Sequence, residues 1–505
     1  MLVLVGNLYV DNPTQESDMS IIAAGIDPVT YFCGLLGKNI SEVCALAKTA
    51  LDGAEDGEIY FERTETEILS IDDARIESPD RSVSQGFGLR RVSGQSVFYA
   101  HDDVITADAI LHVGAELRAI DKHSRLYVPQ AKRTAIPSFY GDTLATPHLV
   151  DCVKLLQEID AYARTHEVVT NVSVTLLGAL SYILIVRADD THEYDIRPMT
   201  RLYITIQCTD GSSRESTNEI VSGRDEYNRV SRENIWKPEV DLLLKKTKDK
   251  LRAKPCPSGQ MPVILAPGWA AIFLHEAFGH GLEADFVWRK TTVFADLLGK
   301  RVASNVVNVV DDGTIPRARG SLNIDDEGTP TERTVLIQDG ILVGYMHDRQ
   351  SARLLGAHAT GNARRESYRH HPQVRMRSTL LLGGESTPEE IIAATQYGIY
   401  MASFEGGQVD TVTGQFVFNS DLAYMVVDGK IQDPVIGATL IGNCATALLH
   451  VDMVGNDFAI SGAGSCGKGG QTVPVGVGQP TLRLSGGITV GGTEVSQTEG
   501  AHSDN

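Results

Sequence analysis

The chain has few cysteines, and none of them stands in a paired spacing. Seven are scattered along 505 residues, with no CxxC pair and no regular interval between them. An odd and sparse set does not indicate a disulfide framework, and it fits the reducing conditions of a cytoplasm. We therefore expect a cytoplasmic protein.

Long apolar runs and a basic leader segment are also missing. The first residues, Met1 to Gly6, are apolar, but no basic stretch precedes them and Asp11 interrupts the segment early. A secretory signal needs both a basic start and a longer apolar run. No run approaches the roughly 20 apolar residues that a membrane-spanning helix requires. We expect a soluble protein that has no membrane partner.

Basic residues are scarce relative to acidic ones. The chain holds 45 Lys and Arg against 65 Asp and Glu, which gives a formal net charge of −20. Such a balance argues against a broad phosphate-binding surface, although it does not rule out a local basic patch. We therefore expect no nucleic-acid partner.

The length and the element pattern predict an α+β protein of two domains. A chain of 505 residues is too long for one ordinary core. Residues 1–235 are expected to form an α+β domain with an antiparallel sheet, because helical and alternating segments do not follow a βαβ order. Predicted helices cover 41–51, capped by Ser41, 103–120 and 147–165. Predicted strands cover 58–63, 65–71, 86–92, 96–100, 168–177, 180–188 and 200–208, and a polar segment covers 215–232.

Residues 236–505 are expected to form a β-rich, sandwich-like or barrel-like domain that carries a metal-site helix. A helix over 238–253 and a buried strand over 261–266 lead to a second helix from about Trp269. Later strands are rich in Val, Ile and Thr, and Asp339-Gly340 and Asp428-Gly429 are typical hairpin turns. These strands cover 306–310, 334–338, 341–347, 415–419 and 423–427.

The second helix contains two histidines that flank a carboxylate, His275-Glu276 and His280. This pattern is typical of zinc hydrolases, in which two imidazoles hold the metal and the adjacent Glu acts as a base. The familiar spacing is i and i+4, whereas here it is i and i+5. A step of five rotates the side chain by about 140° net on a regular helix, so the two rings would not share a face. They would converge if the helix carries a π-bulge or unwinds near Gly279, and we expect such a distortion there. The spacing alone leaves a second interpretation equally open, in which this is a buried helix with two hydrogen-bonded histidines and a surface Glu.

A catalytic zinc generally takes a third protein ligand, and the residues alone leave its identity open. The candidates are Glu283, Asp285, the pair His370-His371, and Cys466 in a glycine-rich segment where Lys468 could hold a thiolate. Composition alone favours a different interpretation of Cys466, as an inert thiol in a glycine-rich loop. The arginines around His370-His371, which include Arg364 and Arg365, disfavour a cation there. Arg364 and Arg365 could bind a substrate carboxylate or pair with Glu366 and other acids.

A series of ordered blocks resembles the TldD branch of the TldD/PmbA family, known also as modulators of DNA gyrase. The likeness spans nearly all of the second half and, more loosely, the element pattern of the first. One block could arise by accident, but the whole series could not. The blocks are 275–283 (HEAFGHGLE), 326–330 (DEGTP), 361–367 (GNARRES), 406–411 (GGQVDT), 453–457 (MVGND), 465–468 (SCGK) and 474–480 (PVGVGQP).

The resemblance implies a zinc metallopeptidase with one zinc per chain. By analogy with the family, His275, His280 and Cys466 are the ligands and Glu276 is the general base. Family members generally pair with a paralogue that lacks the metal motif, and they trim unfolded peptides such as a microcin precursor and a labile antitoxin. A homodimer is the other possibility. Gly469 departs from the family pattern, in which an acidic residue is expected, but it touches no expected ligand.

We therefore expect metal-assisted hydrolysis of unfolded or extended peptides, with Glu276 shuttling the proton to the leaving amine. Two alternatives remain. Cys466 could instead be the nucleophile of a metal-independent hydrolase. The chain could also be a non-catalytic scaffold that binds a partner and merely retains the motif.

Overall fold

A computed structural model describes residues 26–121, 149–224, 230 and 235–492. The apolar Met1 to Gly6 segment and Asp11 lie outside the described residues. So do Pro147 and His148 of the helix expected over 147–165, and most of 225–232 in the polar segment. The domain boundary near Ile235 stays a prediction.

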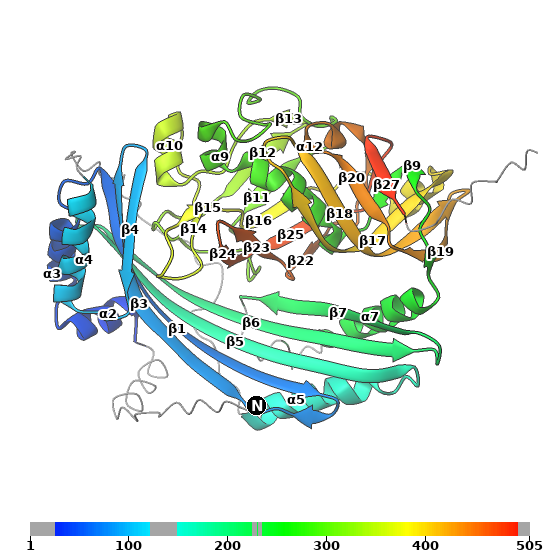
Figure 1. The fold of residues 1–505 in the computed structure, drawn as a ribbon, viewed down its shortest axis with the longest axis horizontal. Coiled ribbons are helices and arrows are strands. Elements are labelled where there is room, and N and C mark those ends of the chain that lie inside the picture. Colours follow the sequence, from blue (N-terminus) through cyan, green and yellow to red (C-terminus); the bar gives the residue numbers. More distant parts are fainter. Residues whose placement is uncertain (1–25, 122–148, 225–229, 231–234, 493–505) are drawn as a thin grey trace, which may run out of the picture.

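The N-terminal half is built on a strongly curved antiparallel sheet (Figure 1). Its strand order is β4-β3-β1-β5-β6-β7, with β2 paired to β1. Two pairs of short predicted strands, 58–63 with 65–71 and 168–177 with 180–188, are each one long continuous strand. The polar segment after 214 begins with a strand that the sequence did not predict. The bounds are β1 Asp56–Asp72, β2 Arg75–Ile76, β3 Asp80–Ser93, β4 Ser96–Asp102, β5 Val169–Arg187, β6 His192–Thr209 and β7 Arg214–Gly223.

Helices cover the convex face of this sheet, and its concave face turns toward the C-terminal half (Figure 1). Side chains alternate between the two faces along each strand. On β6, Leu202 and Ile204 are fully buried in the core beneath the helices, whereas Arg201 points to the other face and is only partly buried. The helices are α2 Pro28–Leu36, α3 Ile40–Ala50, α4 Ala107–Ile120, α5 Leu149–Ala163 and α7 Trp236–Leu251, and α7 packs on β6 and β7.

The first turn of α3 corrects one detail of the sequence prediction. Asn39, not Ser41, is the N-cap: its side chain accepts from the amide of Glu42 at 3.0 Å, and the Glu42 carboxylate accepts from the amide of Asn39 at 2.8 Å. This capping box satisfies two amides that would otherwise lack partners, so the helix begins at Ile40.

The described residues of the C-terminal half form a ten-stranded and a six-stranded sheet with two separate hairpins. The pairing is mostly antiparallel, but three pairs are parallel: β10 with β17, β16 with β25 and β8 with β19. The expected α+β class with a β-rich C-terminal half is therefore confirmed. The ten-stranded sheet holds β8 Lys254–Pro255, β9 Gly259–Gln260, β10 Val263–Leu265, β17 Tyr397–Val409, β18 Gln415–Val427, β19 Lys430–Ile436, β20 Thr439–Asn443, β21 Val451–Val454, β26 Leu482–Leu484 and β27 Ile488–Gly491. The six-stranded sheet holds β11 Val309–Asp312, β12 Arg333–Gln338, β13 Ile341–Leu342, β16 Ser378–Leu381, β22 Ala459–Ser461 and β25 Gly476–Gln479, and the hairpins are β14 Ala363–Arg364 with β15 Gln373–Val374 and β23 Ser465–Lys468 with β24 Gln471–Pro474.

The two Asp-Gly turns are where the sequence places them. Asp339 and Gly340 have φ of 48° and 76°, and Asp428 and Gly429 have φ of 51° and 70°. Left-handed conformations at both central residues match the twist of the flanking strands. The turns join β12 to β13 and β18 to β19. The strand expected over 341–347 ends at Leu342, and those expected over 415–419 and 423–427 are a single strand.

The largest hydrophobic core cluster lies beneath the helix that carries His275 and His280, which is one of several short helices in the C-terminal half. Phe273 and Phe278 are 1% exposed, and Phe273 packs edge-on against Phe416 with ring centroids 5.2 Å apart. This packing fixes the helix against the ten-stranded sheet. Within the described residues no helix has both the length and the apolar character needed to cross a bilayer. The other short helices are α9 Ala284–Arg289, α10 Arg349–Leu355, α11 Pro388–Ala393 and α12 Cys444–Ala447.

Buried ion pairs tie the curved sheet to the C-terminal half. Arg349 donates to Asp56 at 2.9 Å and to Glu58 at 2.8 Å, and Arg197 donates to Asp326 at 2.6 Å. All five side chains are at least nine-tenths buried. Removing one partner of such a pair leaves a buried charge without compensation, which costs about 3–5 kcal/mol. These pairs therefore fix how the concave face meets the C-terminal half.

Candidate metal centre

The histidine helix is distorted where the spacing predicts it. A 3₁₀ turn over Gly268–Ala271 leads into one α turn, then a π turn over His275–Gly279 and a second 3₁₀ turn over His280–Leu282. The amide of His280 donates to the carbonyl of His275, which is the i to i+5 hydrogen bond that defines a π turn. The two candidate ligands are therefore the two ends of one such bond.

Close packing explains the glycines beside His280. A Cβ on Gly279 would lie 2.0 Å from Sδ of Met376, and one on Gly281 would lie 2.6 Å from the ring of Phe294. Larger residues would push the turn away from these buried neighbours. The glycines thus allow the π turn to sit close enough to the core to aim both imidazoles the same way.

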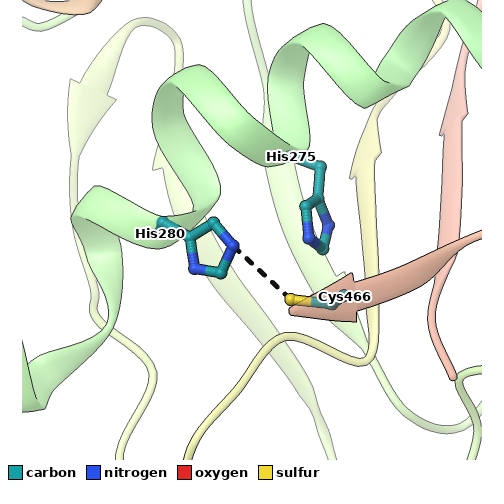
Figure 2. Close-up of side chains that lie close together, drawn as sticks. All are labelled: His275, His280 and Cys466. Carbon is teal, nitrogen blue, oxygen red and sulfur yellow. Dashed lines mark hydrogen bonds between the residues drawn. The ribbon is translucent and has the colours of Figure 1, made fainter. Parts of the chain in front are cut away.

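His275, His280 and Cys466 come together in three dimensions (Figure 2). Their ligand atoms all lie within 4.8 Å of one another, and Nε2 of His280 is 3.4 Å from Sγ of Cys466. The histidines come from the distorted helix and the cysteine from β23, nearly 190 residues later. Their exposed fractions are 0%, 7% and 1% respectively.

The donor set fits a tetrahedral zinc ion. Both ring nitrogens of His275 are buried without a hydrogen-bond partner, which is costly, and a metal ion would bind one of the two. Zinc bonds of about 2.0–2.1 Å to nitrogen and 2.3 Å to sulfur place tetrahedral ligand atoms about 3.4–3.6 Å apart. The observed separation of His280 and Cys466 matches this spacing. Two imidazoles and a thiolate leave one position for a substrate or water, as in catalytic sites.

Glu276 stands at the accessible side of the cluster. Its carboxylate is 3.8 Å from Nε2 of His280, and the side chain is 23% exposed, more than any of the three candidate ligands. A carboxylate that is close to the centre and open to solvent can exchange a proton with a group bound there.

Glu283 and Asp285 support the centre and do not belong to the three-residue group. Glu283 is fully buried and accepts from Nδ1 of His280 at 2.9 Å, which turns Nε2 of that ring toward Cys466. Lys468 donates to Glu283 at 2.9 Å and to Asp285 at 2.8 Å. Lys468 therefore neutralises these carboxylates, and it does not contact the thiol as the sequence suggested.

The close approach of these charged groups shifts the pKa values of Glu283, His280 and Cys466. Burial by itself would raise the pKa of Glu283, but Lys468 and His280 lower that pKa to about 2. Burial would lower the pKa of His280, yet the negative charges of Glu283 and of the Cys466 thiolate hold it well above its usual range. Burial would raise the pKa of Cys466, whereas His275 and His280 hold it well below that of a free thiol. A thiolate is thus the favoured state of Cys466, as metal binding requires.

The remaining sequence candidates lie elsewhere. Nδ1 of His370 bonds Oγ of Ser367 at 3.0 Å, and the ring of His371 packs 6.2 Å from that of Tyr99. Neither histidine belongs to the metal group.

Arg364 and Arg365 are both buried, and neither pairs with Glu366. Arg365 pairs with Glu58 at 3.0 Å and lies over the ring of Tyr60. Arg364 donates to the carbonyls of Met376 and Pro474, both at 2.7 Å.

One supporting residue was not foreseen. Arg375 is fully buried and donates to the carbonyl of Cys466 and, at 3.4 Å, to that of Gln471. It thereby binds both strands of the β23–β24 hairpin that carries the thiol. No local pattern marks Arg375 for this role, because its partners lie about 90 residues further along the chain.

Family models match both halves of the chain. The model for the PmbA/TldA metallopeptidase C-terminal domain matches residues 258–492, and the model for domain 1 of the same metallopeptidases matches residues 57–121. The first match includes all three residues of the metal group and Glu276.

Relatives that match over most of their length are named as metalloproteases of the TldD type. A metalloprotease TldD homologue of Buchnera aphidicola is 38% identical over 454 residues, which cover 86% of this chain and 92% of the relative. The homologue of Haemophilus influenzae is 38% identical over 456 residues, with the same coverage. A relative from Saccharolobus solfataricus, named a zinc metalloprotease TldD homologue, is 26% identical over 449 residues, covering 87% of this chain and 97% of the relative.

Solved structures show the same fold. A protein of Thermotoga maritima described as a modulator of DNA gyrase has a TM-score of 0.74 at 19% identity, covering 90% of this chain and 99% of its own. TldE of Thermococcus kodakarensis has a TM-score of 0.72 at 17% identity, covering 89% and 99%.

Proposed function

The chain belongs to the PmbA/TldD family of metallopeptidases, and on this basis we propose that it is a zinc peptidase that hydrolyses unfolded or extended peptides. The observation that carries the proposal is the convergence of His275, His280 and Cys466 on one point beside the partly exposed Glu276. The unpartnered nitrogens of His275 support a resident metal ion.

In this proposal His275, His280 and Cys466 hold one zinc per chain. The bound zinc would supply Lewis acidity that activates water and polarises the scissile carbonyl. Glu276 takes the proton from the attacking water and gives it to the leaving amine. Because its side chain is partly exposed, it can also exchange protons with solvent between turnovers. Glu283 holds the proton of His280 on Nδ1, so that Nε2 keeps its lone pair for the metal.

We propose extended peptides as substrates because of the hairpin that carries Cys466. Among the described residues, β23 and β24 pair only with each other, so the hairpin has edges along which a peptide could lie as an added strand. In a folded protein most backbone N–H and C=O groups are already paired, so few of its segments can bind in this way. A folded substrate that is cleaved as fast as its unfolded form would contradict this part of the proposal.

We also propose a cytoplasmic dimer, either with a paralogue that lacks the metal motif or with a second copy. This follows the family resemblance alone. Light scattering on the purified chain, with and without a co-expressed paralogue, measures the assembly directly. A monomer under both conditions would contradict it.

The decisive test is metal content together with cleavage. Elemental analysis should find about one zinc per chain in the wild type, and much less in Cys466→Ala. Glu276→Gln should keep the zinc and lose peptide cleavage. Zinc-loaded wild-type protein that cleaves no unstructured peptide, even with a partner present, would favour the scaffold alternative.

The low pKa of Cys466 also suits a nucleophile, so the cysteine-hydrolase alternative needs its own test. A chelator should abolish cleavage, and zinc should restore it. Cleavage that survives the chelator but is blocked by thiol alkylation would favour the alternative. Alkylation alone cannot decide, because it also removes a ligand.

A further inference from the structure

A cavity of about 400 Å³ lies between the curved sheet and the β23–β24 hairpin. Its floor is the concave face of the sheet, where strand alternation and register bring side chains of β1, β5 and β6 side by side. Arg201 stands opposite Leu177, Met199 opposite Ala179 and Arg197 opposite Ser181. Ser465 of β23 and Pro474 of β24 form part of the opposite wall.

Arginines dominate the charge of this cavity. Six arginines line it against three acidic residues, Glu62, Asp326 and Glu366. Each acid already has partners: Asp326 binds Arg197, Glu62 accepts from the amide of Tyr368, and Glu366 accepts from the amide of Thr472. The acids therefore do not balance the arginines. The six are Arg197, Arg201, Arg224, Arg319, Arg364 and Arg365.

Three of these arginines have no carboxylate partner among the described residues. Arg364 binds two backbone carbonyls. Arg319 donates to the carbonyl of Gly464 at 2.9 Å and to the hydroxyl of Ser222 at 2.8 Å. Arg201 lies over the ring of Tyr203, and its Nε is buried without a hydrogen-bond partner. Buried guanidinium groups are ordinarily paired with acids.

The cluster is held together against repulsion. Burial, and then the charges of Arg201 and Arg224, lower the pKa of Arg319 to about 9. Burial also lowers the pKa of Arg364 to about 9. The charge of Asp326 opposes this effect, and the neighbouring arginines add to it. An anion placed among the three guanidinium groups would relieve both the repulsion and the unmet donor of Arg201.

We propose that Arg201, Arg319 and Arg364 form an anchoring subsite for a carboxylate of the peptide substrate, which is either its free C-terminus or an acidic side chain. The proposal rests on the peptidase function above. Planar guanidinium groups bind carboxylates through paired N–H donors, and the cavity is too small for more than a short stretch of peptide.

The subsite and the metal centre share the hairpin. Ser465 lines the cavity, whereas the next residue, Cys466, turns to the other face of the strand and toward His280. Arg319 contacts Gly464 and Ser465 directly. The anchored carboxylate is thus held on the far side of the hairpin from the reacting bond. Its loss should raise KM and leave kcat nearly unchanged, since the contact is equal in the ground and transition states.

Binding measured without turnover tests the subsite independently of catalysis. Labelled peptides that differ only in charge are titrated by fluorescence anisotropy into zinc-loaded Glu276→Gln protein. One peptide has a free C-terminus and one internal Glu, the second is amidated at the C-terminus, the third carries Gln for Glu, and the fourth has both changes. The peptide that lacks the anchoring carboxylate should bind about tenfold more weakly, which is about 1.4 kcal/mol. Which peptide is weakened then shows whether the anchor is the C-terminal carboxylate or the Glu side chain.

A variant pair assigns the effect to the cavity. Arg201→Met removes the charge of a partly buried side chain that lies over the ring of Tyr203 and makes no ion pair among the described residues, so the fold should tolerate it. It should weaken the acidic peptide about tenfold and the doubly neutral peptide by less than twofold. Arg214→Met, on the neighbouring strand β7 and exposed, removes the same charge away from the cavity and should change neither. Equal binding of all four peptides, or an equal loss for all of them in Arg201→Met, would overturn the subsite. Peptides that bind as predicted but are never cleaved by zinc-loaded wild type would instead count against the proposed function alone.

Discussion

Replacing Gly279 with alanine tests whether packing around the π turn sets the metal geometry. The new Cβ would lie 2.0 Å from Sδ of Met376, whose side chain is itself fully buried, so either this side chain or the turn must shift. Forced overpacking of this kind costs about 1–3 kcal/mol. The apo protein can relieve the strain by shifting the turn, but the zinc-bound form must keep His275 and His280 converged. Zinc affinity should therefore fall roughly 5- to 150-fold.

A chromophoric chelator that competes for zinc measures this change directly. Gly34→Ala is the matched control, because Gly34 also lies within a helix and its added Cβ would meet nothing within 4 Å. That variant should leave zinc affinity unchanged and slightly raise the melting temperature. Gly279→Ala with the affinity and melting behaviour of Gly34→Ala would refute the reasoning.

A second substitution isolates the cause. Met376→Ala alone creates a cavity and should destabilise the protein by about 2–5 kcal/mol. Combined with Gly279→Ala, it opens room for the new methyl group, so the double variant should recover most of the zinc affinity that Gly279→Ala lost. If the losses of zinc affinity in the two single variants simply add in the double variant, the effect of Gly279→Ala does not come from its contact with Met376. It would then have another cause, for example the helix backbone.

Three further predictions concern the site and its surroundings. Glu283→Gln should weaken zinc binding about 10- to 100-fold, measured by chelator competition, because it removes the charge that orients His280. Chelator treatment should lower the melting temperature, and zinc should restore it; no shift would mean that the metal is not bound by the folded state. Burial raises the pKa of Glu62 to about 7, so the folded state binds this proton more tightly than the unfolded chain does. The contribution of Glu62 to stability is then complete below about pH 4.5 and is lost as the pH rises to about 7, by at most about 3 kcal/mol, and Glu62→Gln should flatten the fall in melting temperature across that window.

Local sequence was enough for elements whose causes are local. The i, i+5 histidine spacing with Gly279 predicts the distorted helix, and the two Asp-Gly pairs predict hairpins, because the backbone conformations at stake depend on neighbouring residues. Long strands were broken in the prediction. Gly178 interrupts the alternation near the middle of β5, but pairing with β1 and β6 on both sides carries the strand through.

Contacts between distant residues could not be predicted in the same way. The residues alone left four candidates for the third ligand, and the family resemblance singled out Cys466. The fold gives the physical reason, because Cys466 approaches Nε2 of His280 whereas Glu283 binds Nδ1 on the other side of the ring. The arginine cavity is a similar case. Arg201, Arg319 and Arg364 have no common motif, and they meet only because the curved sheet faces the hairpin.

The strand β23 explains how the metal centre and its support remain coupled. Cys466 and Lys468 are two residues apart, so they emerge from the same face of the strand. The first approaches Nε2 of His280, and the second binds Glu283, which accepts from Nδ1 of the same ring. The position of β23 therefore fixes the groups that face both ring nitrogens of His280. Because Lys468 binds Glu283 and Asp285 and none of the three residues of the metal group, these ion pairs can hold the hairpin in place without a contribution from a metal.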